Sequence, residues 1–278
     1  MSIIVPNTRI YNPNEKFPFE YTQRYGIDRR HWSTQGLICF WLMNASAGNI
    51  ITDLSGNGKT GTLQGTAPSW RVGQLGSAVD LPGTNEYISF ASAIPEIAAG
   101  NDFSLSFWFI ADTVAAQQQI FANTITAAVS RTTLSLVNDG EIKAGVFTGG
   151  ATWGDSRASS TALSAGVLYN FVYTYAGVSG STGKAYLNGV LQSGTDTPFT
   201  DSVTGLSIGR RNGNDLFLNA GLEIFSAYNR VLTQSEIVSL FREPLIMFKD
   251  PNRMLLGGFE AAAPPTGIPI LRRRREGC

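Results

Sequence analysis

The chain has 278 residues, of which 43% are apolar, 15% are charged and 30 are glycine. This composition suits one large all-β domain with extensions, or two small domains, because it can build a core and supplies many turns. The 21 basic and 21 acidic residues balance, so no overall electric field favours nucleic acid or an anionic membrane as a partner. Two cysteines, Cys39 and Cys278, are too few for a disulfide framework.

The N-terminal segment, residues 1–34, combines three prolines with six aromatic residues in an otherwise polar stretch. This mixture is too aromatic for a plain disordered tail, so we expect an extended arm that packs on its own domain or on a neighbour. The segment lacks the basic and apolar regions of a signal peptide. The chain has no apolar run of about 18 residues, so no membrane insertion is expected.

Strand patterns separated by turn residues run from Leu37 to about Tyr228. Residues Phe103–Phe109 alternate large apolar and mostly small polar side chains, and aromatic residues occupy every second position from Tyr169 to Tyr175. This period of two is typical of half-buried strands. Shorter strands are predicted at Ala78–Leu81, Tyr87–Phe90, Gln119–Ala122, Leu206–Ile208 and Leu222–Tyr228.

Two turns predict hairpins. Asn188-Gly189 lies between short apolar runs, and both residues can adopt the positive φ that a tight hairpin turn requires. Asp139-Gly140 indicates a second hairpin, between 134–138 and 142–147.

One helix is predicted near the C-terminus. Thr233 and Glu236 form a capping box at its start. Ile237, Leu240 and Phe241 share one face, and the helix is expected to end near Pro244. Beyond it come an aperiodic apolar stretch, an Ala-Pro linker and four arginines, 272–275.

An ordered set of motifs along residues 37–242 resembles laminin-G-like domains of the concanavalin A-like superfamily. The resemblance implies an all-β, two-sheet antiparallel jelly-roll sandwich with one short C-terminal helix. It divides the chain into an extended arm (1–34), a sandwich (35–245) and a C-terminal extension with a basic tail (246–278). The matching stretches are Leu37–Trp41, Asp53–Leu63, Gly76–Gly83, Glu86–Ile88, Phe103–Trp108, Lys184–Gly189, Leu206–Gly209, Gly221–Glu223, Tyr228–Thr233 and Glu236-Ile237 with Leu240.

The loop Asp53–Gly58 is a candidate calcium site. Its carboxylate, short polar side chains and glycines could direct oxygen atoms inward, as Ca²⁺ requires. In calcium-binding relatives this loop acts with an acid on the closing strand, so the resemblance implies Asp53, Asn57 and Glu223 as ligands. Glu223 stands where the family usually has Asp. The alternative is a loop whose side chains satisfy its own backbone.

Enzymatic activity is not expected. Glycosidases of this superfamily place two carboxylic acids along one strand, facing each other about 5 Å apart, and no such spacing occurs in the chain. The only histidine, His31, has no candidate nucleophile nearby in the sequence.

Three functions remain open. The first is a structural or decoration protein of a virion, located on the capsid or tail surface. The segments 29–32 and 242–248 look like the flanks of laminin-G-like domains in phage structural proteins. Other virion proteins or further copies of the chain would then be the partners, contacted through the arms. Candidate assembly residues are Phe17, Phe19, Tyr21, Trp32, Ile268, Ile270, Arg272 and Arg273. The alternative is that both arms fold back on their own sandwich.

The second function is a lectin-like carbohydrate-binding module, which could coexist with the first. Sugars stack on aromatic faces and hydrogen-bond to polar side chains, which points to Trp153, Asp155, Asn212 and Asn214 in two polar loops. Trp153 could instead cap the edge of the core. The third and least favoured function is a glycoside hydrolase.

Trp41 and Trp108 are predicted to be core residues, Trp108 lying on the opposite pleat from its aromatic neighbours.

Overall fold

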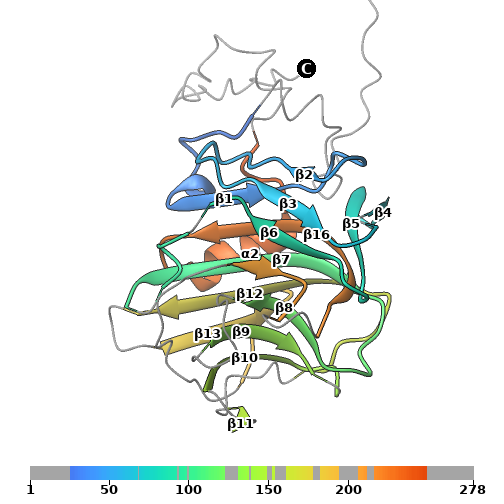
Figure 1. Cartoon of the computed structure of the whole chain (residues 1–278). Coiled ribbons are helices and arrows are strands. Elements are labelled where there is room, and N and C mark those ends of the chain that lie inside the picture. The colour runs from blue at the N-terminus through green and yellow to red at the C-terminus, as the bar shows by residue number, and fades with distance from the viewer. Residues whose placement is uncertain are drawn as a thin grey trace, which may run out of the picture.

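Two antiparallel β-sheets stack face to face in the computed structural model (Figure 1). The structure describes residues 26–248, except for residues 68, 93, 99, 123–130, 138, 149–151, 154–160, 178–181, 194–205 and 212–215. The strand-rich pattern and the short helix predicted from the sequence are confirmed.

The first sheet contains eight of the described strands and includes the longest ones. Its order is β14 (Val190–Leu191), β13 (Thr182–Leu187), β12 (Leu168–Ala176), β7 (Asp102–Ala111), β16 (Asn219–Tyr228), β5 (Ser77–Pro82) and β4 (Ser69–Val72), while β1 (Leu37–Trp41) also pairs with β16. The predicted Asn188-Gly189 hairpin joins β13 and β14, with φ of 49° and 79° at its two residues.

The second sheet also has eight described strands. Its order is β11 (Thr152–Trp153), β10 (Ile142–Thr148), β9 (Arg131–Leu136), β8 (Gln118–Ala122), β15 (Ser207–Ile208), β6 (Tyr87–Phe90), β3 (Gly61–Gln64) and β2 (Ile50–Ile51). β9 and β10 are the two strands of the second predicted hairpin. At one side of the sandwich, the outermost strands of the two sheets are β4 and β2.

The side chains form two hydrophobic layers. Between the sheets, alternate residues of β7, from Phe103 to Phe109, are fully buried together with Trp41. The other face of β7 carries Trp108, which is 7% exposed and stacks on Phe241 with the ring centroids 5.8 Å apart. Both tryptophans are therefore core residues, as predicted, and the element that covers Trp108 is the helix.

That helix is α2 (Gln234–Arg242), and its N-terminus has the predicted capping box. The Thr233 side chain accepts a hydrogen bond from the Glu236 amide, and the Glu236 carboxylate accepts one from the Thr233 amide at 2.8 Å. Ile237 and Leu240 are buried against the outer face of the first sheet. The apolar residues of α2 repeat about every 3.6 positions rather than every two, and the helix that they form covers the second hydrophobic layer.

The segments that flank the sandwich also belong to this second layer. Ile27 forms an isolated antiparallel bridge with Phe248, and the Asp28 amide donates a hydrogen bond to the Met247 carbonyl at 2.8 Å. Met247 is 1% exposed, and Trp32, in the short 3-10 helix η1 (Trp32–Thr34), is half-buried against the same layer. Contacts of the sandwich therefore include residues on both sides of 35–245, and the division into arm, sandwich and extension stays a prediction.

Trp32 packs partly buried against the chain's own sandwich, and its role in assembly stays a prediction. The remaining predicted assembly residues lie outside the described part of the chain. They are Phe17, Phe19, Tyr21, Ile268, Ile270, Arg272 and Arg273.

Candidate functional site

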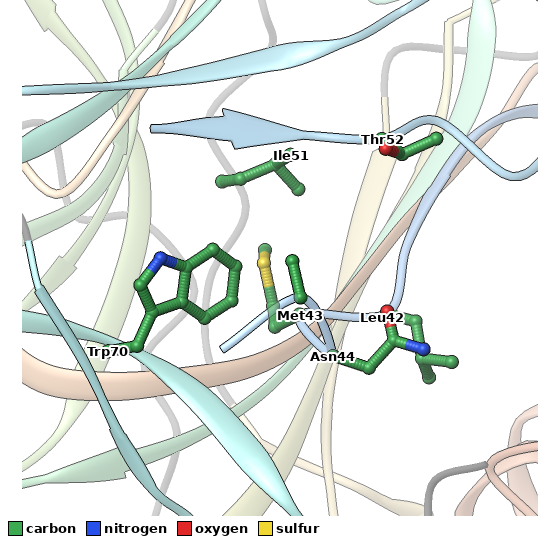
Figure 2. Close-up of a pocket in the computed structure, with 7 residues that line it drawn as sticks. Leu42, Met43, Asn44, Ile51, Thr52 and Trp70 are labelled. Atoms are coloured by element: carbon green, nitrogen blue, oxygen red, sulfur yellow. The ribbon is translucent and has the colours of Figure 1, made fainter. Parts of the chain in front are cut away.

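A small pocket opens where the outermost strands β4 and β2 approach each other, beside the loop that follows β1. We call it the Trp70 pocket, and its volume is about 10 Å³. β4 supplies the tryptophan, β2 and the residue after it supply a second wall, and the loop after β1 supplies the rest (Figure 2). The lining residues are Leu42, Met43, Asn44, Ala45, Ile51, Thr52 and Trp70.

The Trp70 ring is held in place. Its indole N–H donates a hydrogen bond to the Gly48 carbonyl at 2.8 Å, and its ring packs against the sandwich core while remaining partly exposed. The loop opposite has Met43 and Ser46 at φ of 54° and 60°. Left-handed conformations at such residues cost free energy and cluster at functional sites, where the surrounding structure enforces them. The pocket therefore combines a fixed aromatic ring with a strained loop.

The walls divide by polarity. In Figure 2 the side chains of Met43 and Ile51 lie next to the indole of Trp70, whereas Asn44 and Thr52 lie on the side away from it. Met43 and Ile51 are 1% and 2% exposed, so the apolar wall is rigidly packed. A ligand group that enters the pocket would meet an apolar surface at one end and hydrogen-bonding side chains at the other.

The predicted calcium loop is organised around the carboxylate of Asp53. One of its oxygens accepts hydrogen bonds from the Phe40 amide at 3.0 Å and the Ser55 amide at 2.9 Å. The other accepts from the Ser55 hydroxyl and the Lys59 amide, both at 2.9 Å. Asn57 turns its amide N–H groups toward the carbonyls of β1. This is the arrangement of the alternative interpretation, in which the loop satisfies its own backbone.

The third predicted ligand, Glu223, is fully buried and holds a different loop. Its two carboxylate oxygens accept hydrogen bonds from the Gln74 amide at 2.8 Å and the Leu75 amide at 2.7 Å. A Cβ atom on Gly73 would lie 2.5–2.8 Å from this carboxyl group, so the close approach requires glycine.

The hydrogen bonds of the Asp53 and Glu223 carboxylates, as described above, share no partner. Within the described residues, no group of three or more His, Cys, Asp and Glu side chains could hold a metal ion. The structure thus gives both carboxylates hydrogen-bonding roles, and calcium binding stays a prediction.

The predicted glycan-binding residues are largely beyond what the structure describes. Asp155, Asn212 and Asn214 lie outside the described residues, as does the side chain of Trp153. The backbone of Trp153 lies in β11, the outermost strand of the second sheet, and pairs with Phe147. Neither the stacking role nor the core-edge role of Trp153 is therefore tested.

A second polar surface lies on the outer face of the second sheet. Ile88 of β6 is buried in the core, so its neighbours Tyr87 and Ser89 point to the opposite face. There the Arg210 guanidinium lies 3.5 Å from the centroid of the Tyr87 ring, and the Gln64 amide donates a hydrogen bond to the Ser89 hydroxyl at 3.2 Å. Because a guanidinium already covers one face of Tyr87, the Trp70 pocket is the better candidate for stacking a sugar.

Sequence reasoning missed Trp70, Asn44 and Thr52. Trp70 lies in a four-residue strand that no alternating pattern marks, and the other two flank apolar residues in separate segments. Nothing in the local sequence around Trp70 indicates that it lines a pocket. Among the described helices, none is long and apolar enough to span a membrane.

A family profile described as the concanavalin A-like lectin/glucanases superfamily matches residues 82–238, which is more than half of the chain. The predicted resemblance is therefore confirmed at the level of the superfamily. A comparison with curated proteins finds no match.

Solved structures with this fold include carbohydrate-active proteins. Domain 4 of AbnA, a GH43 extracellular arabinanase from Geobacillus stearothermophilus, in complex with arabinotriose, is 21% identical, with a TM-score of 0.59. The match covers 73% of this chain and 97% of that domain. Trypanosoma rangeli sialidase in complex with sialic acid is 17% identical, with a TM-score of 0.57, and the match covers 77% of this chain but only 34% of the sialidase.

The receptor-binding domain of botulinum neurotoxin mosaic serotype C/D is also similar. It is 17% identical with a TM-score of 0.55, and the match covers 77% of this chain and 52% of that domain. At these identities the likeness establishes the sandwich fold alone.

Proposed function

The chain belongs to the concanavalin A-like lectin/glucanases superfamily, and on that premise we propose that it is a non-catalytic glycan-binding protein. The observation that carries the proposal is the fixed, partly exposed indole of Trp70 in a pocket that also contains Asn44 and Thr52. Aromatic faces stack on the C–H surfaces of sugars, and neighbouring polar groups set their orientation. The arabinotriose complex of the similar arabinanase domain is consistent with this role.

Three buried carboxylates support the non-catalytic part of the proposal. A glycosidase needs one carboxyl group free to donate a proton and a second free to act as nucleophile or base. Asp53 and Glu223 instead hold backbone amides, and the buried Glu86 accepts hydrogen bonds from the Ala67 and Asn85 amides. These carboxylates serve to fix loops.

Trp70→Ala tests glycan binding. We expect wild-type protein to bind members of an oligosaccharide panel in titration calorimetry and Trp70→Ala to bind them about tenfold more weakly or worse, because the stacking surface is lost. Trp70→Phe should retain part of the affinity. Val190→Ala is the matched control, since Val190 is 63% exposed, lies on β14 at the opposite edge of the same sheet and does not line the pocket.

Two results would overturn the proposal. The first is the absence of binding to every glycan in the panel, and the second is equal affinity of the wild type and Trp70→Ala. The non-catalytic part fails separately if reducing sugar is released from a polysaccharide and one acidic substitution abolishes that release.

A structural role in a larger particle is the second candidate function, with a virion as the proposed location. The supporting observation is the bridge between Ile27 and Phe248, because it places the two ends of the described part of the chain side by side, next to the segments 1–25 and 249–278 in the sequence. Two extensions that start together could bind one neighbouring subunit, either a further copy of the chain or another virion protein.

A comparison of the full chain with residues 26–248 tests this second candidate. We expect the full chain to sediment as an oligomer, or with a particle, and residues 26–248 to remain folded as a monomer. If both species sediment as the same monomer, or if residues 26–248 assemble as well as the full chain, the extensions have no assembly role. A shorter fragment, residues 35–245, is not suitable for this comparison, because it lacks the buried Met247 and Phe248.

A further inference from the structure

We infer that the Trp70 pocket recognises the acetamido group of an N-acetylated amino sugar. The inference rests on the proposed glycan-binding function and names the class of sugar. It follows from the size of the pocket, the division of its walls and the residues beside its mouth.

The size of the pocket limits the group that can enter. The centre of a water-sized sphere can move through about 10 Å³ inside the pocket, which leaves room for roughly one small group. A whole pyranose ring is far too large, so the ring must remain outside and only a substituent can enter. A pocket of this size favours recognition of one substituent on one sugar over recognition of a long polymer.

The polarity of the walls selects the substituent. A hydroxyl placed beside Met43, Ile51 and Trp70 would lose hydrogen bonds to water, whereas a methyl group gains from leaving water. The methyl of a 6-deoxy sugar would satisfy the apolar wall but would bring no amide to the polar side. An acetamido group carries a methyl group and an amide on the same substituent, which matches an apolar wall that faces Asn44 and Thr52 (Figure 2).

The surface beside the pocket can receive the sugar ring. Residues two apart on a strand share a face, so Val72 projects to the same side of β4 as Trp70. Its side chain is 92% exposed. This apolar side chain offers contact for the C–H groups of a ring whose substituent occupies the pocket.

The test compares ligands that differ only in the acetamido group. Titration calorimetry with the trisaccharide of β-1,4-linked N-acetylglucosamine and with cellotriose, which has hydroxyl groups at the same positions, should show about tenfold or greater preference for the acetylated ligand. Saturation-transfer NMR should place the acetyl methyl protons closest to the protein. A trisaccharide with N-propionyl groups should bind more weakly than the acetylated one, because the extra carbon exceeds the pocket.

Ala45→Leu is the matching protein variant. Ala45 lines the pocket and is partly exposed, so a larger side chain fills the cavity without entering the core. We expect this variant to keep the wild-type melting temperature and to lose the preference for the acetylated ligand. Val190→Ala, at the opposite edge of the first sheet, should keep that preference.

The outcomes separate the inference from the proposed function. If both trisaccharides bind equally and Trp70→Ala weakens both, glycan binding stands and the acetamido inference is overturned. The inference also fails if Ala45→Leu retains the full preference, because the acetyl group must then bind elsewhere. If neither these ligands nor the wider oligosaccharide panel binds, both the inference and the proposed function fall.

Discussion

Replacement of Trp41 by alanine is the most direct test of the packing between the two sheets. Its side chain is fully buried, with ring centroids 4.5 Å from Phe90 and 5.1 Å from Phe225. The indole N–H donates a hydrogen bond to the Lys59 carbonyl at 2.7 Å. A Cβ atom on Gly61 would lie 2.8 Å from the indole ring, so the ring fills the space beside a strand that has no side chain there.

The free energy of unfolding should fall by about 4–6 kcal/mol in Trp41→Ala. Loss of a large buried aromatic side chain costs about 3–5 kcal/mol, since its neighbours relax only partly into the cavity. Loss of the strong donor to the Lys59 carbonyl adds about 1 kcal/mol. This second contribution is at the low end of its range, because the Cys39 thiol remains as a weak donor 3.5 Å away.

Urea denaturation followed by circular dichroism measures this change. Trp41→Phe keeps most of the ring volume but loses the indole hydrogen bond, so we expect a loss of about 1–3 kcal/mol. The exposed substitution Val72→Ala should change stability by less than about 0.5 kcal/mol. A loss below about 1.5 kcal/mol for Trp41→Ala, with an unchanged denaturant slope, would refute the placement of this ring in the core.

Three further predictions concern packing, calcium and titration. Trp108→Ala should lower stability by about 3 kcal/mol or more in the same assay, because its ring lies between the first sheet and α2; an unchanged unfolding midpoint would contradict this. Thermal melting in calcium and in chelator tests the calcium prediction, since binding to the native state alone must raise the melting temperature. Identical melting curves would dismiss calcium binding. The Asp53→Asn variant should melt at a lower temperature in both buffers, because the Asp53 carboxylate organises the loop. Burial raises the pKa of the Cys39 thiol well above its ordinary value, so in a variant lacking the other cysteine a thiol reagent should react only after denaturation. Burial also raises the pKa of Tyr228 to about 12 from 10.0. The contribution of this raised pKa to stability is complete below pH 10 and is lost as the pH rises toward 12, because the unfolded state releases the proton first. A spectrophotometric titration in which every tyrosine ionises near pH 10 would exclude this.

Local patterns in the sequence determined the type of most elements. The alternation in β7 and β12, the Asn188-Gly189 turn and the capping box of α2 each depend on residues within a few positions of one another, so they are visible before folding. The same patterns predicted that Trp41 and Trp108 are buried, although they did not identify α2 as the cover of Trp108. Pairing between strands that are far apart in the sequence, such as β1 and β16 of the first sheet, left no comparable local signal.

Only the tertiary structure decided the roles of Glu223 and Trp70. Glu223 meets the amides of Gln74 and Leu75 across about 150 positions of sequence, with the partners 149 and 148 residues away. Trp70 lines one pocket with Asn44 and Thr52 because the outermost strands of two different sheets converge there. Propensity and periodicity act over a few neighbouring residues, whereas these contacts depend on how the sheets stack. The sequence alone therefore could not show that Trp70 lines a pocket.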